Sequence, residues 1–213
     1  TRIPSLKTVD AFRAHVASLG IEIPCEDEIA GSDSAIGQPL TALMVNGKTL
    51  GNRIALHPME GWDGTTDGGV TDPMRRRWRR FGESGAKLIC GAEAMAVRPD
   101  GRANPNQLII NEANQAGLVE LRDLLLTAHR EKYGTTDDLA LGFQLTHSGR
   151  FCRPNGKFAY EPRIAYRHPI LDDKFKVQRD GDVWTDDDVE ELIADYVRAA
   201  RIAREVGADF VDL

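Results

Sequence analysis

The stretch RIALHPMEGWDG, in the first third of the chain, joins an apolar run to side chains that bind ligands or move protons. His57 and Glu60 are titratable, and Pro58, Met59 and Trp62 place apolar surface beside them. A positioned carboxylate or imidazole acts as a general acid or base when it is within hydrogen-bond reach of a reacting group. A turn that only ends a strand needs none of these groups, so we interpret this stretch as one wall of a binding site.

Two later stretches repeat the pattern of an apolar run followed by polar side chains. GAEAM contains Glu93 and Ala94, and FQLTHSGR contains Gln144, His147 and Arg150. The carboxamide of Gln144 is both donor and acceptor, so it matches an N–H beside a C=O on a ligand. Structural roles remain alternatives for three of these residues. His147 could stabilise the turn after the strand, and Arg150 could form an ion pair. Glu93 could pair with Arg53 or with another cation at a strand end.

Composition limits the classes of partner. The formal net charge of -6 argues against a nucleic-acid or anionic-membrane binder, and no apolar run approaches the ~20 residues of a membrane span. The three cysteines, Cys25, Cys90 and Cys152, form neither a metal-ligand pattern nor a disulfide framework. We therefore expect a cytoplasmic protein without a metal site.

Strand, loop and helix signals recur from Arg53 onward. The first strand is expected at residues 53–57, and its helix begins with Asp72 as N-cap and Pro73 at the first helical position. Met74, Trp78 and Phe81 form the inward stripe of this helix. The arginines of the same helix, at positions 75–80, are interpreted as a solvated face, with a phosphate-bearing ligand as the alternative.

The next units follow the same order. A second strand in AKLICGAEA ends near Ala94, and its helix runs from Asn111 to about Lys132. A third strand at 139–145 precedes a helix that Thr185 and Asp188 open in a near capping box. The expected inward stripe of that last helix is Val189, Leu192, Ile193, Tyr196, Val197, Ala200 and Ala203. A fourth strand, ADFVDL, then begins.

Alternating strands and helices predict parallel pairing and an α/β fold. No G-x-G-x-x-G follows the first strand, which disfavours a Rossmann fold. We predict a (β/α)8 TIM barrel, of which residues 41–213 are the first half, cut at the fourth strand. Residues 1–40 form an N-terminal helical extension, and Asn46-Gly47 turns a hairpin that caps the barrel.

The connection from Thr146 to Trp184 is long for a barrel loop, since connections above ~12–15 residues are uncommon unless functional or disordered. It contains aromatic residues, which argues against disorder, and we interpret it as a lid or substrate-recognition segment. KFKVQRDGDVW within it resembles a hairpin that turns at Asp180-Gly181.

Active sites of such barrels lie at the carboxyl ends of the strands, so the three polar stretches should converge. Their motifs, in order, are NRI…PM (Asn52, Arg53, Ile54, Pro58, Met59), EA…GR (Glu93, Ala94, Gly101, Arg102), QLxHxGR (Gln144, Leu145, His147, Gly149, Arg150) and GxD (Gly207, Asp209). Their order and spacing resemble the old yellow enzyme family of FMN-dependent ene-reductases and NADH:flavin oxidoreductases, from about residue 42 onward.

The resemblance implies an FMN across the strand ends. By analogy, the segment from His57 to Glu60 lines the flavin, Ala94 approaches the ring edge and Gln144 reaches the pyrimidine part. Trp62 would border the substrate. His147 and Arg150 are further substrate-side candidates.

Glu60 departs from the family pattern, which has Thr or Cys there. An ionised carboxylate would lower the flavin reduction potential unless burial keeps the acid protonated, so Glu60 is a candidate for tuning or proton donation. The implied reaction passes hydride from NADH or NADPH through FMN to an activated C=C bond of a small unsaturated carbonyl compound, in a homo-oligomer. A cofactor-free barrel lyase or aldolase, disfavoured because no lysine follows these strands, and a non-catalytic half-barrel for assembly are the alternatives.

Overall fold

The computed structural model describes residues 2–27, 31, 33–177 and 180–213. In chain order the helices and strands are α1 (Val9–Ser18), β1 (Leu40–Val45), β2 (Lys48–Leu50), β3 (Ala55–Leu56), α2 (Asp72–Glu83), β4 (Leu88–Ile89), β5 (Ala94–Ala96), α3 (Gln115–Tyr133), β6 (Ala140–Thr146), α4 (Pro169–Phe175), α5 (Asp186–Val206) and β7 (Phe210–Asp212). β1 and β2 form the predicted hairpin, and the strands from β3 onward form one parallel sheet.

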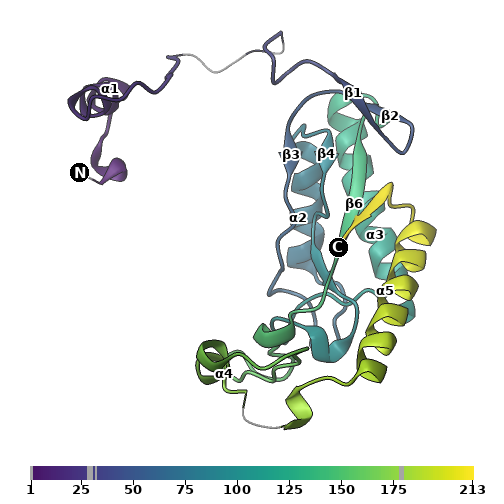
Figure 1. The fold of residues 1–213 in the computed structure, drawn as a ribbon. Helices are drawn as coiled ribbons and strands as arrows, with labels where there is room; N and C mark the ends of the chain where they lie inside the picture. Colours follow the sequence, from purple (N-terminus) through teal and green to yellow (C-terminus); the bar gives the residue numbers. More distant parts are fainter. Residues whose placement is uncertain (1, 28–30, 32, 178–179) are drawn as a thin grey trace.

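β6 is the centre of the parallel sheet. Gln144 pairs with Ala94 of β5 and with Asp212 of β7, so these two strands flank β6. At the other end of β6, Ala140 pairs with Leu88 of β4. All of these strands run in the same direction, so the loops that follow β3, β5 and β6 gather at the end of the sheet near α4 (Figure 1).

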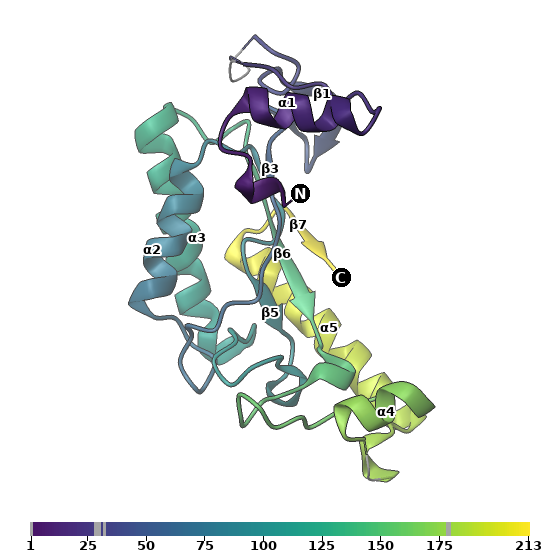
Figure 2. The same ribbon diagram turned by 90° about the vertical axis from the view of Figure 1, so that its left-hand side faces the viewer.

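Helices α2 and α3 pack against each other along one side of the sheet (Figure 2). Met74 and Trp78 of α2 are fully buried, as are Leu118, Leu121 and Leu125 of α3, as the apolar periodicity predicts. The Trp78 ring meets Phe143 of β6 edge-on, at a centroid distance of 6.0 Å. The core thus lies between the sheet and these helices.

The N-terminal segment leaves the sheet as an arm that carries α1 away from the body (Figure 1). Thr8 caps α1 by accepting a hydrogen bond from Ala11 N at 3.1 Å. No helix within the described residues is both long and apolar enough to cross a membrane.

Two sequence predictions about element ends are wrong. The N-cap of α2 is Thr71, whose extended backbone leaves Asp72 and Pro73 in the first turn. The second strand does not end near Ala94: it breaks after Ile89 and resumes as β5. The break contains Gly91 and Ala92, whose φ angles are +88° and +37°. An apolar composition does not reveal such an interruption.

Of two further predictions in the last third of the chain, one fails and the other is correct only in part. The expected hairpin is absent among its described residues, since Lys174 and Phe175 end α4 and a 3-10 turn covers Asp180–Asp182; residues 178–179 lie outside the described residues. The predicted α5 stripe is correct in part, since Leu192, Tyr196 and Ala200 pack against the core and Ala203 is buried. Ile193 and Val197 are 51% and 46% exposed, whereas the buried residues are Ala199, Ile202, Ala203 and Val206. The predicted capping box of α5 is present.

Candidate active site

One cavity of about 580 Å³ opens at the carboxyl ends of the strands. Its lining residues are Pro58, Met59, Glu60, Trp62, Ala94, Gln144, Thr146, His147 and Ser148. All predicted site residues except His57 and Arg150 are therefore brought together, and Thr146 and Ser148 are additions that the sequence analysis missed. The volume lies within the ~300–1,000 Å³ of small-molecule sites.

The close approach of Pro58 to the sheet depends on Gly91. A Cβ at Gly91 would lie 2.8 Å from the Cβ of Pro58 and 2.9 Å from the Cβ of Gln144, closer than side chains tolerate. Ala94 N donates to Met59 O at 3.3 Å, which joins the loop after β3 to β5. These contacts make the segment after β3 a fixed wall of the cavity.

A buried ion-pair network fixes the turn that carries Trp62. Glu93 is fully buried and accepts hydrogen bonds from Gly61 N, at 2.7 Å, and from the guanidinium of Arg77. Arg77 also binds Asp63 in the same turn. Burial raises the pKa of Glu93, and the positive charge of Arg77 counteracts that rise.

This network corrects two expectations. The partner of Glu93 is Arg77 and not Arg53, which is exposed. The arginines of α2 are also not one solvated face, since Arg77 is only 29% exposed and Arg75 is paired with Glu120. Because the neighbouring arginines have the same charge, their positions around the helix determine which one reaches Glu93.

Gln144 is held by a residue that the sequence analysis did not find. Its Nε2 donates to Asp212 Oδ2 at 2.7 Å, across the pairing of β6 with β7. The carbonyl oxygen and the second N–H of the Gln144 amide therefore remain for a ligand. The signal that could have found Asp212 is its position in the fourth strand, where a carboxylate among apolar residues needs a partner.

His147 is a neutral side chain at the cavity wall. Its Nδ1 accepts a hydrogen bond from Gly149 N at 3.1 Å, so the ring proton resides on Nε2. That atom is buried and has no hydrogen-bond partner within the described residues. The ring packs edge-on against Trp184 with centroids 4.9 Å apart, and burial lowers the pKa of His147 to about 4.

Glu60 and Trp62 form the outer part of the cavity wall. Partial desolvation raises the pKa of Glu60, and the charge of Arg153 opposes that rise. The Trp62 side chain is 43% exposed, and Arg153 Cζ lies 5.2 Å from its ring centroid. Lys157 Nζ lies 5.5 Å from the same centroid.

The two remaining predicted site residues lie outside this cavity lining. His57 is exposed at the end of β3. Arg150 pairs with Asp172 of α4 and donates to Tyr166 O at 2.9 Å, which is the bracing role that the sequence left open. A ligand contact of either side chain therefore stays a prediction.

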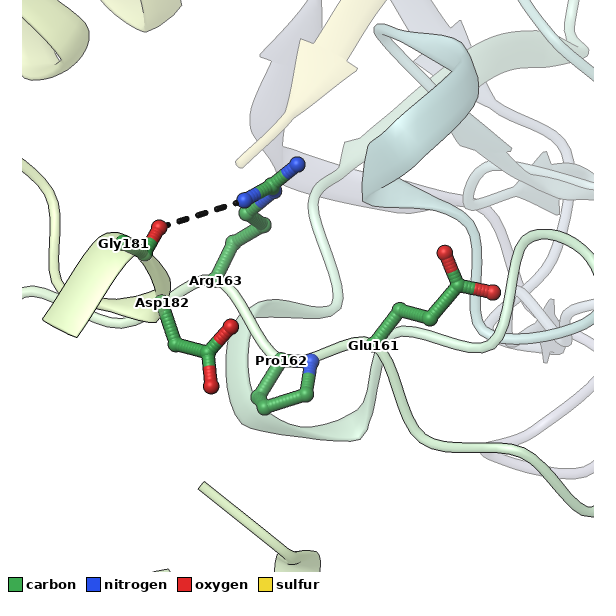
Figure 3. Close-up of a pocket in the computed structure, with 5 residues that line it drawn as sticks. All are labelled: Glu161, Pro162, Arg163, Gly181 and Asp182. Atoms are coloured by element: carbon green, nitrogen blue, oxygen red, sulfur yellow. Dashed lines mark hydrogen bonds between the residues drawn. The ribbon is translucent and has the colours of Figure 1, made fainter. Parts of the chain in front are cut away.

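A second cavity, of about 220 Å³, lies within the long connection after β6. Arg163 reaches the carbonyl of Gly181 at 3.4 Å, while Glu161 points away from it (Figure 3). Asp182 and Pro162 complete the lining. This small polar cavity contains none of the predicted site residues, so the strand-end cavity is the better candidate.

Comparison with protein families agrees with this architecture. A family model described as the NADH:flavin oxidoreductase / NADH oxidase family matches residues 38–213. The chain belongs to this family. Among curated relatives, the NADPH dehydrogenase of Halalkalibacterium halodurans is 27% identical over 174 residues, which cover 81% of this chain and 46% of that protein. The NADPH dehydrogenase of Geobacillus sp. strain WCH70 is also 27% identical, over 79% of this chain and 45% of that protein.

Solved structures confirm the fold of this oxidoreductase-family chain. An old yellow enzyme from Pichia sp. AKU4542 matches with a TM-score of 0.61 and 21% identity, over 84% of this chain and 45% of that one. 2-Naphthoyl-CoA reductase matches with a TM-score of 0.63 and 19% identity, over 83% and 26%. The chain spans about half the length of the curated relatives, so it contains part of a barrel, as the four predicted strands indicated.

Proposed function

We propose that this protein is an FMN-dependent oxidoreductase in which NADH or NADPH is the reductant. The acceptor that we propose is the activated C=C bond of a small unsaturated carbonyl compound. One observation carries the proposal: Pro58, Met59, Ala94 and Gln144 line the same cavity at the carboxyl ends of parallel strands. Function depends on such a site and not on the barrel alone.

The cavity residues fit an isoalloxazine ring. Ala94 offers a methyl group where a larger side chain would fill the space, and Pro58 and Met59 offer apolar contact. The carbonyl oxygen of the Gln144 amide is an acceptor for a ring N–H, and its NH₂ group keeps a second N–H besides the one that it donates to Asp212. We therefore assign the flavin side of the cavity to these residues.

FMN, when bound, supplies the hydride chemistry. The side chains of this chain bind and orient the reactants and exclude water. Trp62 would cover the acceptor, and Glu60 would hold a charge or a proton beside the reacting atoms. His147 is neutral at physiological pH, so its Nε2–H is a donor and not a cationic group.

The first experiment is a titration of the protein with FMN, followed by flavin absorbance and fluorescence. Replacement Ala94→Leu places bulk in the cavity and should weaken FMN binding at least tenfold. The matched control is Ala159→Leu, the same change at an exposed position of the long connection. Equal FMN affinity in both variants, with unchanged circular dichroism, would refute the assignment.

The role of Glu60 is tested by the flavin midpoint potential. A charged carboxylate beside the flavin opposes reduction, so Glu60→Gln should raise the potential. The variant Asp67→Asn, at an exposed carboxylate outside the cavity lining, is the control. If the potential of Glu60→Gln equals that of wild type at pH 7, Glu60 does not tune the flavin.

The alternatives differ in their expected observations. A Schiff-base lyase or aldolase needs a lysine in its site, and no lysine lines the described cavity. A purely structural half-barrel would bind no flavin in the titration above. The cytoplasmic location and the homo-oligomer stay predictions, which fractionation and light scattering of the purified protein would test.

A further inference from the structure

Two cations flank the indole that lines the cavity. Arg153 and Lys157 lie 5.2 Å and 5.5 Å from the Trp62 ring centroid, and both belong to the long connection after β6. Trp62 itself follows β3. The cation–aromatic contact therefore joins two loops that are far apart in sequence. Attraction between a guanidinium and an indole face favours this arrangement.

Arg153 is held in place by backbone and ring contacts. Its Nε donates to Ala103 O at 2.9 Å, and its Cζ lies 5.5 Å from the Tyr160 ring centroid. The Tyr160 ring packs edge-on against Phe175 of α4, at 5.3 Å between centroids. The guanidinium is thus fixed before any ligand enters.

The charge of Arg153 is not cancelled by a paired acid. Within the described residues it forms no ion pair at contact distance, unlike Arg150 or Arg163 of the same connection. The acid that feels its charge is Glu60, whose pKa Arg153 lowers against the effect of desolvation. One arginine therefore acts on both side chains that form the outer cavity wall.

We propose that Arg153 is a positioning residue of the cavity, which fixes the Trp62 indole over the acceptor side and supplies a positive charge to the outer wall that Trp62 and Glu60 form. The term "acceptor side" rests on the proposed function. The contacts of Arg153 with Trp62 and its action on Glu60 belong to this chain alone and are measurable without flavin. If Arg153 were only structural, its hydrogen bond to the backbone of Ala103 would be its whole role, and Trp62 and Glu60 would not respond to its replacement.

The test uses ¹⁹F NMR of protein labelled with 5-fluorotryptophan. The three tryptophans give three resonances, and Trp62→Phe assigns that of Trp62. In a pH titration the Trp62 resonance should respond to ionisation of Glu60, and Glu60→Gln should remove that step. The Trp78 resonance is the internal control, because Trp78 is fully buried and packs against Phe143.

Arg153→Met should move the resting Trp62 resonance and raise the midpoint of its titration, because a cation that lowers the pKa of Glu60 is lost. Arg153→Lys restores the charge and should return the midpoint toward the wild-type value. Arg163→Met removes an arginine of the same connection that pairs with Asp100, and it should leave Trp62 unchanged.

Two results would overturn the proposal. One is a Trp62 midpoint in Arg153→Met equal to that of wild type. The other is an equal displacement in Arg163→Met, which would indicate a general loosening of the connection. A wild-type protein that binds no FMN would refute the proposed function and leave this test valid. FMN binding with an unmoved Trp62 midpoint would refute the Arg153 proposal alone.

Discussion

Replacing Arg77 tests whether the buried ion pair holds the cavity wall. Glu93 is 0% exposed, and its partners are the Arg77 guanidinium and one backbone N–H from Gly61. Arg77→Met keeps an unbranched apolar stem and removes the guanidinium. It leaves a buried carboxylate without its cation, and it releases Asp63 from the same turn.

Removing one partner of a buried pair costs about 3–5 kcal/mol. Arg77 is 29% exposed, so water enters more easily than in a dry core and we expect about 3 kcal/mol. The matched control is Arg79→Met on the same helix. Arg79 and its partner Glu83 are 58% and 41% exposed, and such surface pairs contribute less than about 1 kcal/mol.

The destabilisation should depend on pH. Burial already raises the pKa of Glu93 above its usual 4.5, and loss of Arg77 raises it further. A raised folded-state pKa means that the folded protein retains a proton which the unfolded chain releases. Stability is then lost as pH rises above 4.5, so the difference between Arg77→Met and wild type should grow toward neutral pH.

The free energies of unfolding are measured by urea denaturation at pH 5 and pH 7.5. The proteins compared are wild type, Arg77→Met, Arg79→Met and the double variant Arg77→Met/Glu93→Gln. The double variant should recover much of the loss because it no longer buries a charge. A loss in Arg77→Met below ~1 kcal/mol, or one that is equal at both pH values, would refute the reasoning.

Three further predictions concern the cavity and its support. Gly91→Ala should weaken FMN binding, because φ is +88° and the new Cβ meets Pro58 at 2.8 Å; thermal unfolding and FMN titration check this. Gly101→Ala should disturb His147, whose Cδ2 lies 2.4 Å from the new Cβ, and ¹H–¹⁵N spectra of the imidazole would report it. The pKa of His147 falls to about 4 on folding, so the folded protein binds a proton less readily than the unfolded chain. The free energy of unfolding should therefore decrease as pH falls from 6.5 toward 4, by about 2 kcal/mol at pH 5. In urea titrations, His147→Gln should lack this pH dependence.

The residues of the strand ends were predictable because topology places them. Ala94 and Gln144 are far apart in sequence, but parallel pairing puts the carboxyl ends of strands at one edge, and the two residues are register partners. Apolar periodicity likewise located the buried faces of α2 and α3. These features depend on local pattern and strand direction, which the sequence contains.

Other features depend on contacts that no local pattern encodes. Arg77 differs from its neighbouring arginines only in helical phase, and its partner Glu93 lies in another unit of the fold. The break between β4 and β5 arises because Gly91 must admit Pro58, a contact between two strand ends. The exposure of Ile193 shows the same limit, since which apolar residues are covered depends on how α5 sits against α3 and β6.

The two sides of the cavity are held by different means, and this difference bears on specificity. Ala94 and Gln144 belong to paired strands, so main-chain hydrogen bonds fix the proposed flavin side. Trp62 lies on a loop. The Arg77–Glu93 ion pair fixes the turn that carries it, and Arg153 of the long connection contacts its ring. We therefore expect substitutions in that connection to change the proposed acceptor side without moving the strands. Variants of Arg153 should accordingly alter the KM for an enone such as 2-cyclohexenone while the affinity for FMN stays at the wild-type value; a parallel loss of both would mean that the connection supports the whole cavity.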